Sequence, residues 1–166
     1  MKAKFFRLLL LVGIVYGMNS CSSDSTEDST TASASAQAMS YTYNETELET
    51  MQLINEYRVS IGLNELKEIN HISHVSEGHD EYMISKNVVN HDNFVARSEN
   101  IKTVLGAKSV SENVAYNYNS PKGVLDAWLR SPSHKKTIEG DFTNFGLSIR
   151  VDADGRKYYT NIFTKI

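Results

Sequence analysis

The sequence predicts a single α/β domain, and two kinds of periodicity carry this prediction. In residues 45–62 and 69–86, apolar side chains recur every three or four positions, which is typical of helices with one buried face. In residues 144–151, apolar and polar side chains alternate, which is typical of a strand with one buried face. Helical segments in the first half and extended segments at the end indicate a mixed fold with one core.

Two amphipathic helices are expected in the first half of the domain. The first ends at Gly62, a residue type that commonly follows a helix. The second has charged side chains on its polar side. The apolar positions of the two helices are Leu48, Met51, Ile54, Tyr57 and Ile61 in the first, and Ile69, Ile72, Val75, His79 and Met83 in the second.

Two further helices are expected to begin at serine–proline pairs. The chain has only two prolines, and each follows a serine, at Ser120-Pro121 and at Ser131-Pro132. A serine hydroxyl can accept a hydrogen bond from a free amide of the first helical turn, and proline lacks the amide that would otherwise be unpaired there. We expect Trp128 of the first of these helices to face the core.

The end of the chain predicts a β-hairpin. Beyond the alternating residues 144–151, a second extended run contains Tyr159 and Phe163. Asp154-Gly155 between them is a strong turn signal. Asp152 to Gly155 also suggests a calcium loop, but the residues that follow do not supply a complete set of oxygen ligands, so we favour a plain turn.

The N-terminus has the pattern of a secretory signal peptide over residues 1–20. Lys2, Lys4 and Arg7 precede the apolar run Leu8–Val12, which is too short to span a hydrocarbon core of about 30 Å. Cys21 follows and is the only cysteine, so it cannot form an intramolecular disulfide. Its position resembles the lipobox of bacterial lipoproteins, in which the cysteine is acylated after cleavage; an ordinary cleaved signal is the alternative.

Residues 21–44 are expected to form a lipidated cysteine and a disordered tether, because residues 22–40 are mostly Ser, Thr, Ala and acidic residues. The folded domain is expected at residues 45–166. Removing residues 1–20 takes away three of the 17 basic residues and none of the 20 acidic ones, so the mature chain has a formal charge of −6. This charge argues against nucleic acid as a partner.

Three of the five histidines have simple structural interpretations. His71 and His74 lie three residues apart on the second helix and could pair on a metal, but no third ligand is evident, so a solvated helix face is favoured. His79 belongs to the apolar stripe, which favours a buried imidazole that is hydrogen-bonded to a backbone carbonyl.

Two histidines and a glutamate are stronger candidates for chemistry. His134 lies in the first turn after Ser131-Pro132, where the helix dipole disfavours the imidazolium and so keeps the ring able to bind metal or accept a proton. His91 follows the second helix. Glu112 lies in an apolar and aromatic setting, and a buried acid needs a partner. Periodicity alone would favour a capping or surface role for Glu112.

Segments in a fixed order resemble the short bacterial form of the CAP (SCP/PR-1-like) superfamily over about residues 47 to 166. Ser111–Ala115 is similar to the family's "GENIA" motif, and Ala127–His134 is similar to its "AW-x-x-SPGH" motif. The other matching segments are Asn55–Arg58, His79–Met83, Asn90-His91, Phe145–Leu147 and Tyr159–Phe163.

This resemblance implies an α-β-α sandwich with a central antiparallel sheet, and a cleft that holds His91, Glu112 and His134. Asn113 and Ser131 are expected to line the same cleft. In several relatives the two histidines bind a divalent metal, often zinc, and two imidazoles plus one carboxylate would leave a position for water. Ser131 stands where many eukaryotic members have a second glutamate, so Glu112 alone would serve as metal ligand and base.

The favoured function is a non-enzymatic module: an extracytoplasmic protein, lipid-anchored to a bacterial membrane at Cys21, whose cleft binds a peptide, glycan or lipid of the cell envelope or surface. The alternative is a zinc-dependent hydrolase of peptides or cell-envelope polymers, in which His91 and His134 hold the metal and Glu112 activates water. No HExxH or GxSxG motif is present. In a third interpretation, the cluster around Glu112 is purely structural.

Overall fold

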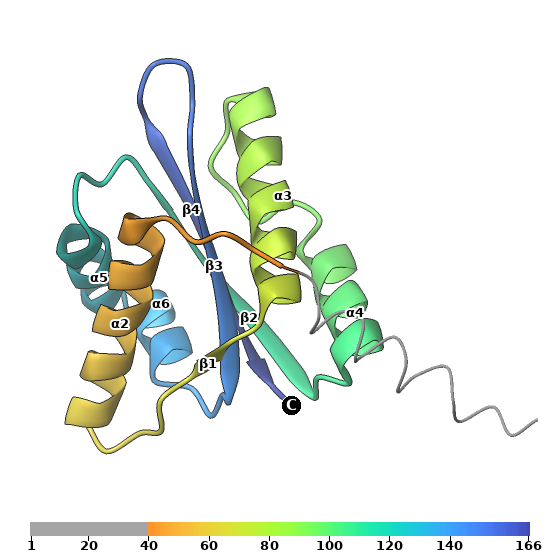
Figure 1. Cartoon of the computed structure of the whole chain (residues 1–166), viewed down its shortest axis with the longest axis vertical. Helices are drawn as coiled ribbons and strands as arrows, with labels where there is room; N and C mark the ends of the chain where they lie inside the picture. The colour runs from red at the N-terminus through yellow and green to blue at the C-terminus, as the bar shows by residue number, and fades with distance from the viewer. Residues whose placement is uncertain (1–39) are drawn as a thin grey trace, which may run out of the picture.

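The computed structural model describes residues 40–166, which form a mixed α/β domain with a central sheet between two helical layers (Figure 1). The expected signal peptide, Cys21 and most of the expected tether lie outside these residues. Within the described part, no helix combines the length and the apolar character needed to cross a membrane. The elements are α2 (Glu45–Ser60), β1 (Lys67–Glu68), α3 (Asn70–Lys86), α4 (Phe94–Leu105), β2 (Ser109–Tyr116), α5 (Pro121–Arg130), α6 (Pro132–Ile138), β3 (Asn144–Val151) and β4 (Lys157–Lys165).

The sheet has the strand order β1-β3-β4-β2. Its three long strands are antiparallel, because β4 pairs in that sense with both β2 and β3. The two-residue strand β1 pairs in parallel with β3 at one edge. The expected antiparallel sheet is therefore confirmed for the long strands, and the short parallel edge strand is an addition that the sequence analysis missed.

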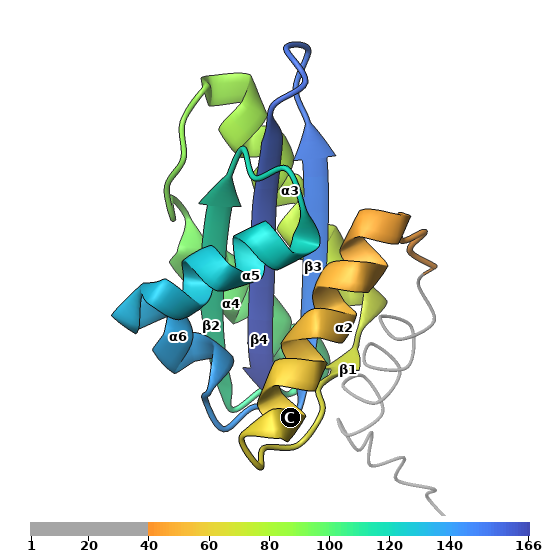
Figure 2. The same ribbon diagram turned by 90° about the vertical axis from the view of Figure 1, so that its left-hand side faces the viewer.

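The helices cover both faces of this sheet, as expected for a sandwich. Helices α2, α5 and α6 lie on one face (Figure 2), and α3 and α4 lie on the other (Figure 1). The larger apolar cluster lies under α2 and α5 and includes Ile54, Trp128 and Phe163. Smaller clusters lie under α3 and α4, around Ile72 and Met83. Trp128 faces the core, as expected, and its indole nitrogen donates to the Val114 carbonyl at 3.1 Å.

The helix boundaries follow the sequence signals. The Ser120 hydroxyl accepts a hydrogen bond from the Gly123 amide at 3.1 Å at the start of α5. Helix α6 begins at Pro132 as expected, but Ser131 caps it without a side-chain hydrogen bond. Helix α2 ends at Ser60, and Gly62 follows with a φ of +84°, which only glycine adopts without strain.

The expected hairpin turn joins β3 to β4. One carboxylate oxygen of Asp152 accepts hydrogen bonds from the amides of Asp154 and Arg156 at 3.0 and 2.9 Å, and the other accepts from the Arg156 guanidinium at 2.7 Å. Gly155 has a φ of +81°. The Asp152 carboxylate is thus used to build the turn, which supports the plain-turn interpretation.

Helix α3 approaches the sheet closely because β3 has a glycine beneath it. A Cβ placed on Gly146 would lie 2.5 Å from the Ser73 amide nitrogen and 2.6 Å from the Ile72 Cβ. The Ser76 hydroxyl donates to the Gly146 carbonyl at 3.1 Å. Gly146 therefore sets the distance between α3, which carries His79, and the sheet that carries Glu112.

The end of α6 is fixed by Arg58, a fully buried residue of α2. Its Nη1 donates to the carbonyls of Ile138 and Gly140 at 2.6 and 2.9 Å, and its Nε donates to the Asn64 carbonyl at 2.9 Å. Burial lowers the pKa of Arg58, although the charge of Asp141 opposes this shift. These bonds hold the short helix that carries His134.

The segment before α2, which we expected to be the end of the tether, contacts the domain. Arg150 donates to the Tyr41 hydroxyl at 2.8 Å and to the buried Glu47 carboxylate at 2.9 Å, and it also pairs with Glu77. The Tyr43 hydroxyl lies 2.9 Å from the Ser73 hydroxyl. The ordered domain therefore includes residues before the expected boundary at residue 45.

Candidate functional site

Glu112 lies on the edge strand β2 and faces α3 and α4. Its neighbours at alternate positions, Val110 and Val114, both pack under these helices, and side chains two residues apart in a strand share a face. The Glu112 side chain is only 1% exposed. Glu112 is therefore a buried acid that needs a partner, and not the capping or surface residue that periodicity alone favours.

Arg97 of α4 is the main partner of Glu112. Its Nε and Nη2 donate to the two carboxylate oxygens of Glu112, both at 2.8 Å, in a bidentate arrangement. Its Nη1 donates to the Asp92 carbonyl at 2.6 Å, in the loop that carries His91. Arg97 thus joins the strand, the helix and the loop at one point.

His91 completes the contacts of the carboxylate. Its Nδ1 donates to Oε1 of Glu112 at 2.9 Å. Because Nδ1 then holds the proton in the neutral ring, Nε2 is left as the acceptor. The His91 side chain is 50% exposed. His91 and Glu112, two of the three predicted site residues, are therefore in direct contact.

The hydrogen bonds keep Glu112 ionised. Burial alone would raise the pKa of this carboxyl group, but the hydrogen bonds from His91 and Arg97, together with the charge of Arg97, outweigh burial and bring the pKa below its usual value. A carboxylate with a low pKa whose two oxygens already accept three hydrogen bonds is poorly suited to take up a proton.

His79 lies beneath this cluster as a buried neutral imidazole. Its Nε2 donates to the Asn90 carbonyl at 2.9 Å, which confirms the expected bond to a backbone carbonyl. The same nitrogen is 3.9 Å from Oε1 of Glu112. Burial lowers the pKa of His79, and the Asn90 bond and the Glu112 charge offset this only in part. The sequence analysis did not anticipate that His79 lies this close to Glu112.

His134 lies near His91 but has no hydrogen bond or ion pair with Glu112 within residues 40–166. Its pKa is lowered mainly by burial and also by the charge of His91. The lowered pKa has the direction that the sequence analysis expected. Asn113 donates to the His134 carbonyl at 3.1 Å, and Ser131 contacts the Ser133 hydroxyl at 3.3 Å.

The described residues do not form a three-ligand metal site. Among them, no group of three His, Cys, Asp or Glu side chains is arranged to hold a metal ion. Glu112 would have to leave Arg97 and His91 before it could bind one. The residues therefore do not fit the three-ligand zinc site that the resemblance implied, although the outer nitrogen of His91 and the neutral His134 ring could still meet a ligand.

His71 and His74 lie apart from this cluster, on a partly exposed side of α3. His71 Nε2 is 2.9 Å from Oδ1 of Asn100, and His74 contacts Glu77. This agrees with the expected solvated helix face.

Arg97 is the functional residue that the sequence analysis missed. It lies on α4, for which no element was predicted. The signal was present but weak: Ser98, Ile101 and Leu105 are the buried positions, at spacings of three and four, and Gly106 ends the helix with a φ of +68°. A basic residue on such a helix gives no indication of the distant carboxylate that it contacts.

Comparison with known proteins identifies one family. The sequence model named CAP, described as the cysteine-rich secretory protein family, matches residues 51–164. A curated relative, the uncharacterized membrane protein YlbC of Bacillus subtilis (strain 168), is 31% identical over 124 residues, which cover 72% of this chain and 34% of that protein. The chain therefore spans about a third of the length of that relative.

Solved structures with the same fold include three bacterial proteins. An outer surface protein of Borrelia burgdorferi is 20% identical, with a TM-score of 0.63, and covers 76% of this chain and 98% of its own. An extracellular protein with an SCP domain from Bacillus anthracis is 22% identical, with a TM-score of 0.64 and coverage of 76% and 45%. A cysteine-rich secretory protein of Staphylococcus aureus is 20% identical, with a TM-score of 0.61 and coverage of 77% and 43%. At these identities the similarity shows the fold alone.

Proposed function

Because this chain belongs to the CAP family of cysteine-rich secretory proteins, we propose that it is an extracytoplasmic binding module, lipid-anchored at Cys21, whose site around His91, Glu112 and His134 binds a component of the cell envelope or surface without hydrolysing it. The proposed chain consists of a signal peptide at residues 1–20, a tether and one folded domain.

The observation that carries this proposal is that both carboxylate oxygens of Glu112 already accept hydrogen bonds from protein side chains. Its carboxylate accepts two hydrogen bonds from Arg97 and one from His91, and its side chain is almost fully buried. A hydrolase would need a carboxylate free to orient or deprotonate water. Here Glu112 instead fixes the ring of His91, whose side chain is half exposed and whose charge acts on His134. Side chains that are already fixed suit ligand recognition, because binding then costs little side-chain entropy.

The binding proposal predicts ligand capture without turnover. Peptidoglycan fragments, an unstructured peptide mixture and lipid vesicles can each be titrated separately into the purified mature protein and followed by NMR. We expect one class to shift the ring signals of His91 and His134, and we expect His91→Ala and His134→Ala to lose that binding. Lys136→Ala, an exposed change on the helix of His134, is the matched control. A hydrolysis product that depends on both histidines would contradict the proposal.

Anchoring at Cys21 is supported by the sequence pattern and by the kinds of relatives. The signal-like residues 1–20 end directly before this cysteine. The relatives include a membrane protein, an outer surface protein and an extracellular protein. A single acyl chain binds membranes only weakly, so stable anchoring needs the several chains of a bacterial lipoprotein or a second contact.

The anchor is testable in cells that express the full chain. We expect the wild type in the detergent-soluble membrane fraction and labelled by a fatty-acid analogue. Cys21→Ser should lose the label and appear in the soluble extracytoplasmic fraction. An unlabelled wild-type protein would refute lipidation while leaving the binding proposal for the domain intact.

A zinc-dependent hydrolase is the second candidate, and one observation favours it. Metal-binding histidines commonly donate their other ring nitrogen to a carboxylate, as His91 does to Glu112. His134 is neutral at physiological pH because burial and His91 lower its pKa. Zinc analysis of purified wild type, His91→Ala and His134→Ala separates the candidates. No bound zinc, together with no change in activity between the variants, would exclude the hydrolase.

A further inference from the structure

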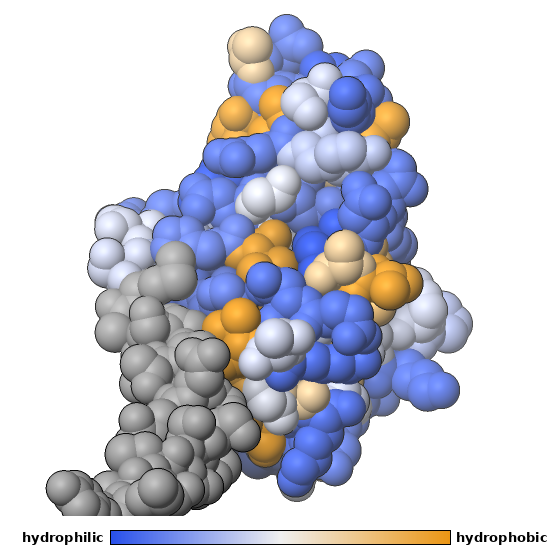
Figure 3. All heavy atoms as spheres, turned by 90° about the vertical axis from the view of Figure 1, so that its right-hand side faces the viewer, coloured by the Kyte–Doolittle hydropathy of each residue, from blue (hydrophilic) through white to orange (hydrophobic). Residues whose placement is uncertain are grey.

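Two adjoining hollows lie between α3 and α4 and together form a groove, which we call the α3–α4 groove. One has a volume of about 430 Å³ and the other about 270 Å³, and Val75 and Arg97 line both. The face that carries them is mostly hydrophilic with separate apolar spots (Figure 3). The larger hollow is also lined by His71, His74, Ala96 and Asn100, and the smaller by Gly78, His79, Tyr82 and Asn93.

Gly78 lines the smaller hollow, and packing does not explain why a glycine stands there. It lies in the middle of α3, where glycine is a poor helix former, and its backbone is not in the left-handed region that glycine serves elsewhere. A Cβ at this position would meet no atom within 4 Å. The fold therefore tolerates any small side chain at residue 78, and the effect of glycine is to keep the hollow open.

The partly exposed ring of Tyr82 lines the smaller hollow, and the buried ring of His79 beneath it has a polar atom without a partner among the described residues. The rings of His79 and Tyr82 are nearly parallel, with an interplanar angle of 11° and centroids 5.9 Å apart. Because Nε2 of His79 donates to Asn90, its Nδ1 is a hydrogen-bond acceptor, and this atom has no partner among the described residues. A buried acceptor without a donor is costly, so a ligand hydroxyl or amide would be well placed to satisfy it.

The charges of the groove favour a neutral ligand. Each of the three nitrogens of the Arg97 guanidinium already donates a hydrogen bond, and Glu112 offsets its charge. No carboxylate lines either hollow, so a cation would find no counter-charge. The remaining polar groups are amides, imidazoles and the Tyr82 hydroxyl, which donates to Asp92, and they are interleaved with Val75 and Ala96. Such a lining suits a molecule that has apolar ring faces and several hydroxyl groups.

We propose that the α3–α4 groove, opened by Gly78 and floored by Val75, His79 and Tyr82, is a second ligand site that binds a short neutral carbohydrate. The apolar face of a sugar ring packs on Tyr82 and Val75, and its hydroxyl groups bond with Asn93, Asn100 and the imidazoles. Neither His91 nor His134 lines this groove, and Arg97, which lines it, also binds Glu112 of the other site.

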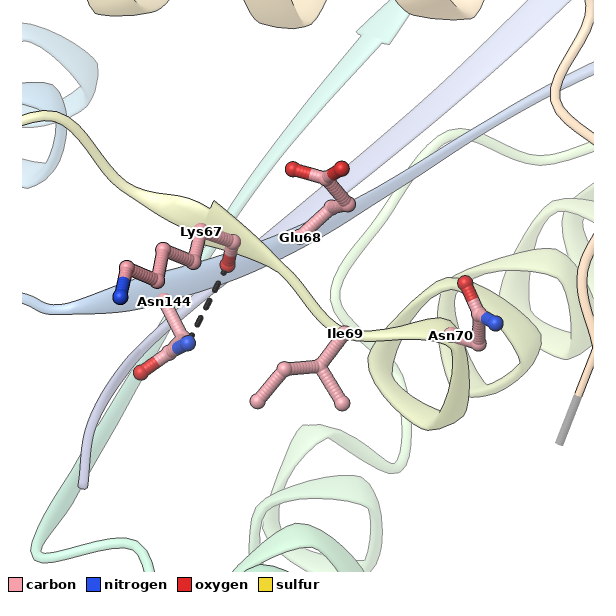
Figure 4. Close-up of a pocket in the computed structure, with 5 residues that line it drawn as sticks. All are labelled: Lys67, Glu68, Ile69, Asn70 and Asn144. Atoms are coloured by element: carbon pink, nitrogen blue, oxygen red, sulfur yellow. Dashed lines mark hydrogen bonds between the residues drawn. The ribbon is translucent and has the colours of Figure 1, made fainter. Parts of the chain in front are cut away.

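A third hollow, at the edge strand β1, has a different character (Figure 4). Its volume is about 420 Å³, and the charged side chains of Lys67 and Glu68 line it. Asn144 of its lining donates to the Lys67 carbonyl at 3.3 Å, a bond that fastens β1 to β3. The residues that line this hollow belong to β1, to the segment after it and to the paired strand β3, and none of them is aromatic.

Substitution of Gly78 separates a binding role from a structural one. Gly78→Ala should raise the melting temperature by about 3 °C, because alanine favours the helix and meets no atom. Gly78→Gln should fill the hollow and weaken binding of the neutral sugars tri-N-acetylchitotriose and maltotriose at least about tenfold, which corresponds to about 1.4 kcal/mol. Glu81→Ala, an exposed change on the same helix, is the control and should keep wild-type affinity.

Binding would be measured by NMR titration of the purified mature protein with each trisaccharide and with inorganic phosphate. We expect one sugar to shift amide signals around Gly78 and Arg97, with phosphate causing no such shift. Failure of both sugars to bind the wild type, or undiminished binding by Gly78→Gln, would overturn the proposal. Sugar binding that is lost in His134→Ala but kept in Gly78→Gln would place the ligand at the other site and overturn it equally.

Discussion

Replacing Arg97 with alanine should destabilise the domain strongly, because it leaves the buried Glu112 carboxylate without its principal partner. The guanidinium supplies two hydrogen bonds of 2.8 Å to this carboxylate, and the side chains of Arg97 and Glu112 are only 11% and 1% exposed. Removing one member of a buried ion pair typically costs about 3–5 kcal/mol. His91 remains as a hydrogen-bond donor, so the lower part of this range is expected.

The free energy of unfolding that Arg97→Ala loses should also depend on pH. In the wild type the lowered pKa of Glu112 stabilises the fold above the ordinary glutamate pKa of about 4.3, and this contribution is lost as the pH falls through the folded-state pKa. Without Arg97, burial dominates and raises the pKa, so the cost grows as the pH rises above the ordinary value. The difference between wild type and Arg97→Ala should therefore be largest near neutral pH and shrink in acid.

Urea unfolding of the two proteins near pH 7 and near pH 4 measures this difference directly. Glu112→Gln combined with Arg97→Ala serves as the control, since the double variant has no unpaired charge left at this position and should recover part of the lost free energy. The reasoning would be refuted if the free energies of unfolding of wild type and Arg97→Ala differed by less than about 1 kcal/mol near neutral pH, or by the same amount at both pH values.

Three other substitutions test the fold that positions the site. Gly146→Ala should lower the free energy of unfolding by about 2–3 kcal/mol in urea titrations, because the new methyl group would overlap Ile72 of α3. Asp80→Asn should stabilise the domain more at alkaline than at acid pH, because burial raises the pKa of Asp80 well above its usual value and its ionised form becomes costlier as pH rises. Trp128→Phe should lower the free energy of unfolding by about 1–3 kcal/mol, because the Val114 carbonyl loses its hydrogen bond from the indole. A lower melting temperature would show this loss.

The features that the sequence predicted well are those encoded by neighbouring residues. The serine–proline pairs predicted the starts of α5 and α6, and alternation predicted β3. Each of these signals depends on contacts within one turn or one strand, so the local sequence contains all the information needed.

The features that the sequence did not predict depend on contacts between distant segments. Strand β1 has only two residues and exists because it pairs with β3, 77 positions further along the chain. Helix α4 begins after Asn93, a residue type that often caps helices, but its backbone is left-handed with a φ of +60° and its side chain makes no capping hydrogen bond, so the start of this helix departs from the usual pattern. The partner of Glu112 was expected from the cost of burying a charge, but only the packing of α4 on β2 identifies it as Arg97.

The candidate site, too, was predicted only in part from the sequence. Motif resemblance brought His91 and Glu112 together correctly, because their segments keep a fixed order and spacing. It also implied that Glu112 acts as a metal ligand, whereas the structure gives both of its oxygens to Arg97 and His91. A motif specifies which residue is present, but the hydrogen bonds that a neighbouring element supplies decide what that residue can do.

A crystal structure of the mature protein grown with zinc is the most direct test of the role assigned to Glu112. We predict that the carboxylate keeps both hydrogen bonds to Arg97 and its bond to Nδ1 of His91, so that any bound metal meets only the outer imidazole nitrogens. A Glu112 carboxylate that has left Arg97 and coordinates zinc together with His91 and His134 would contradict the binding-module account and favour the hydrolase.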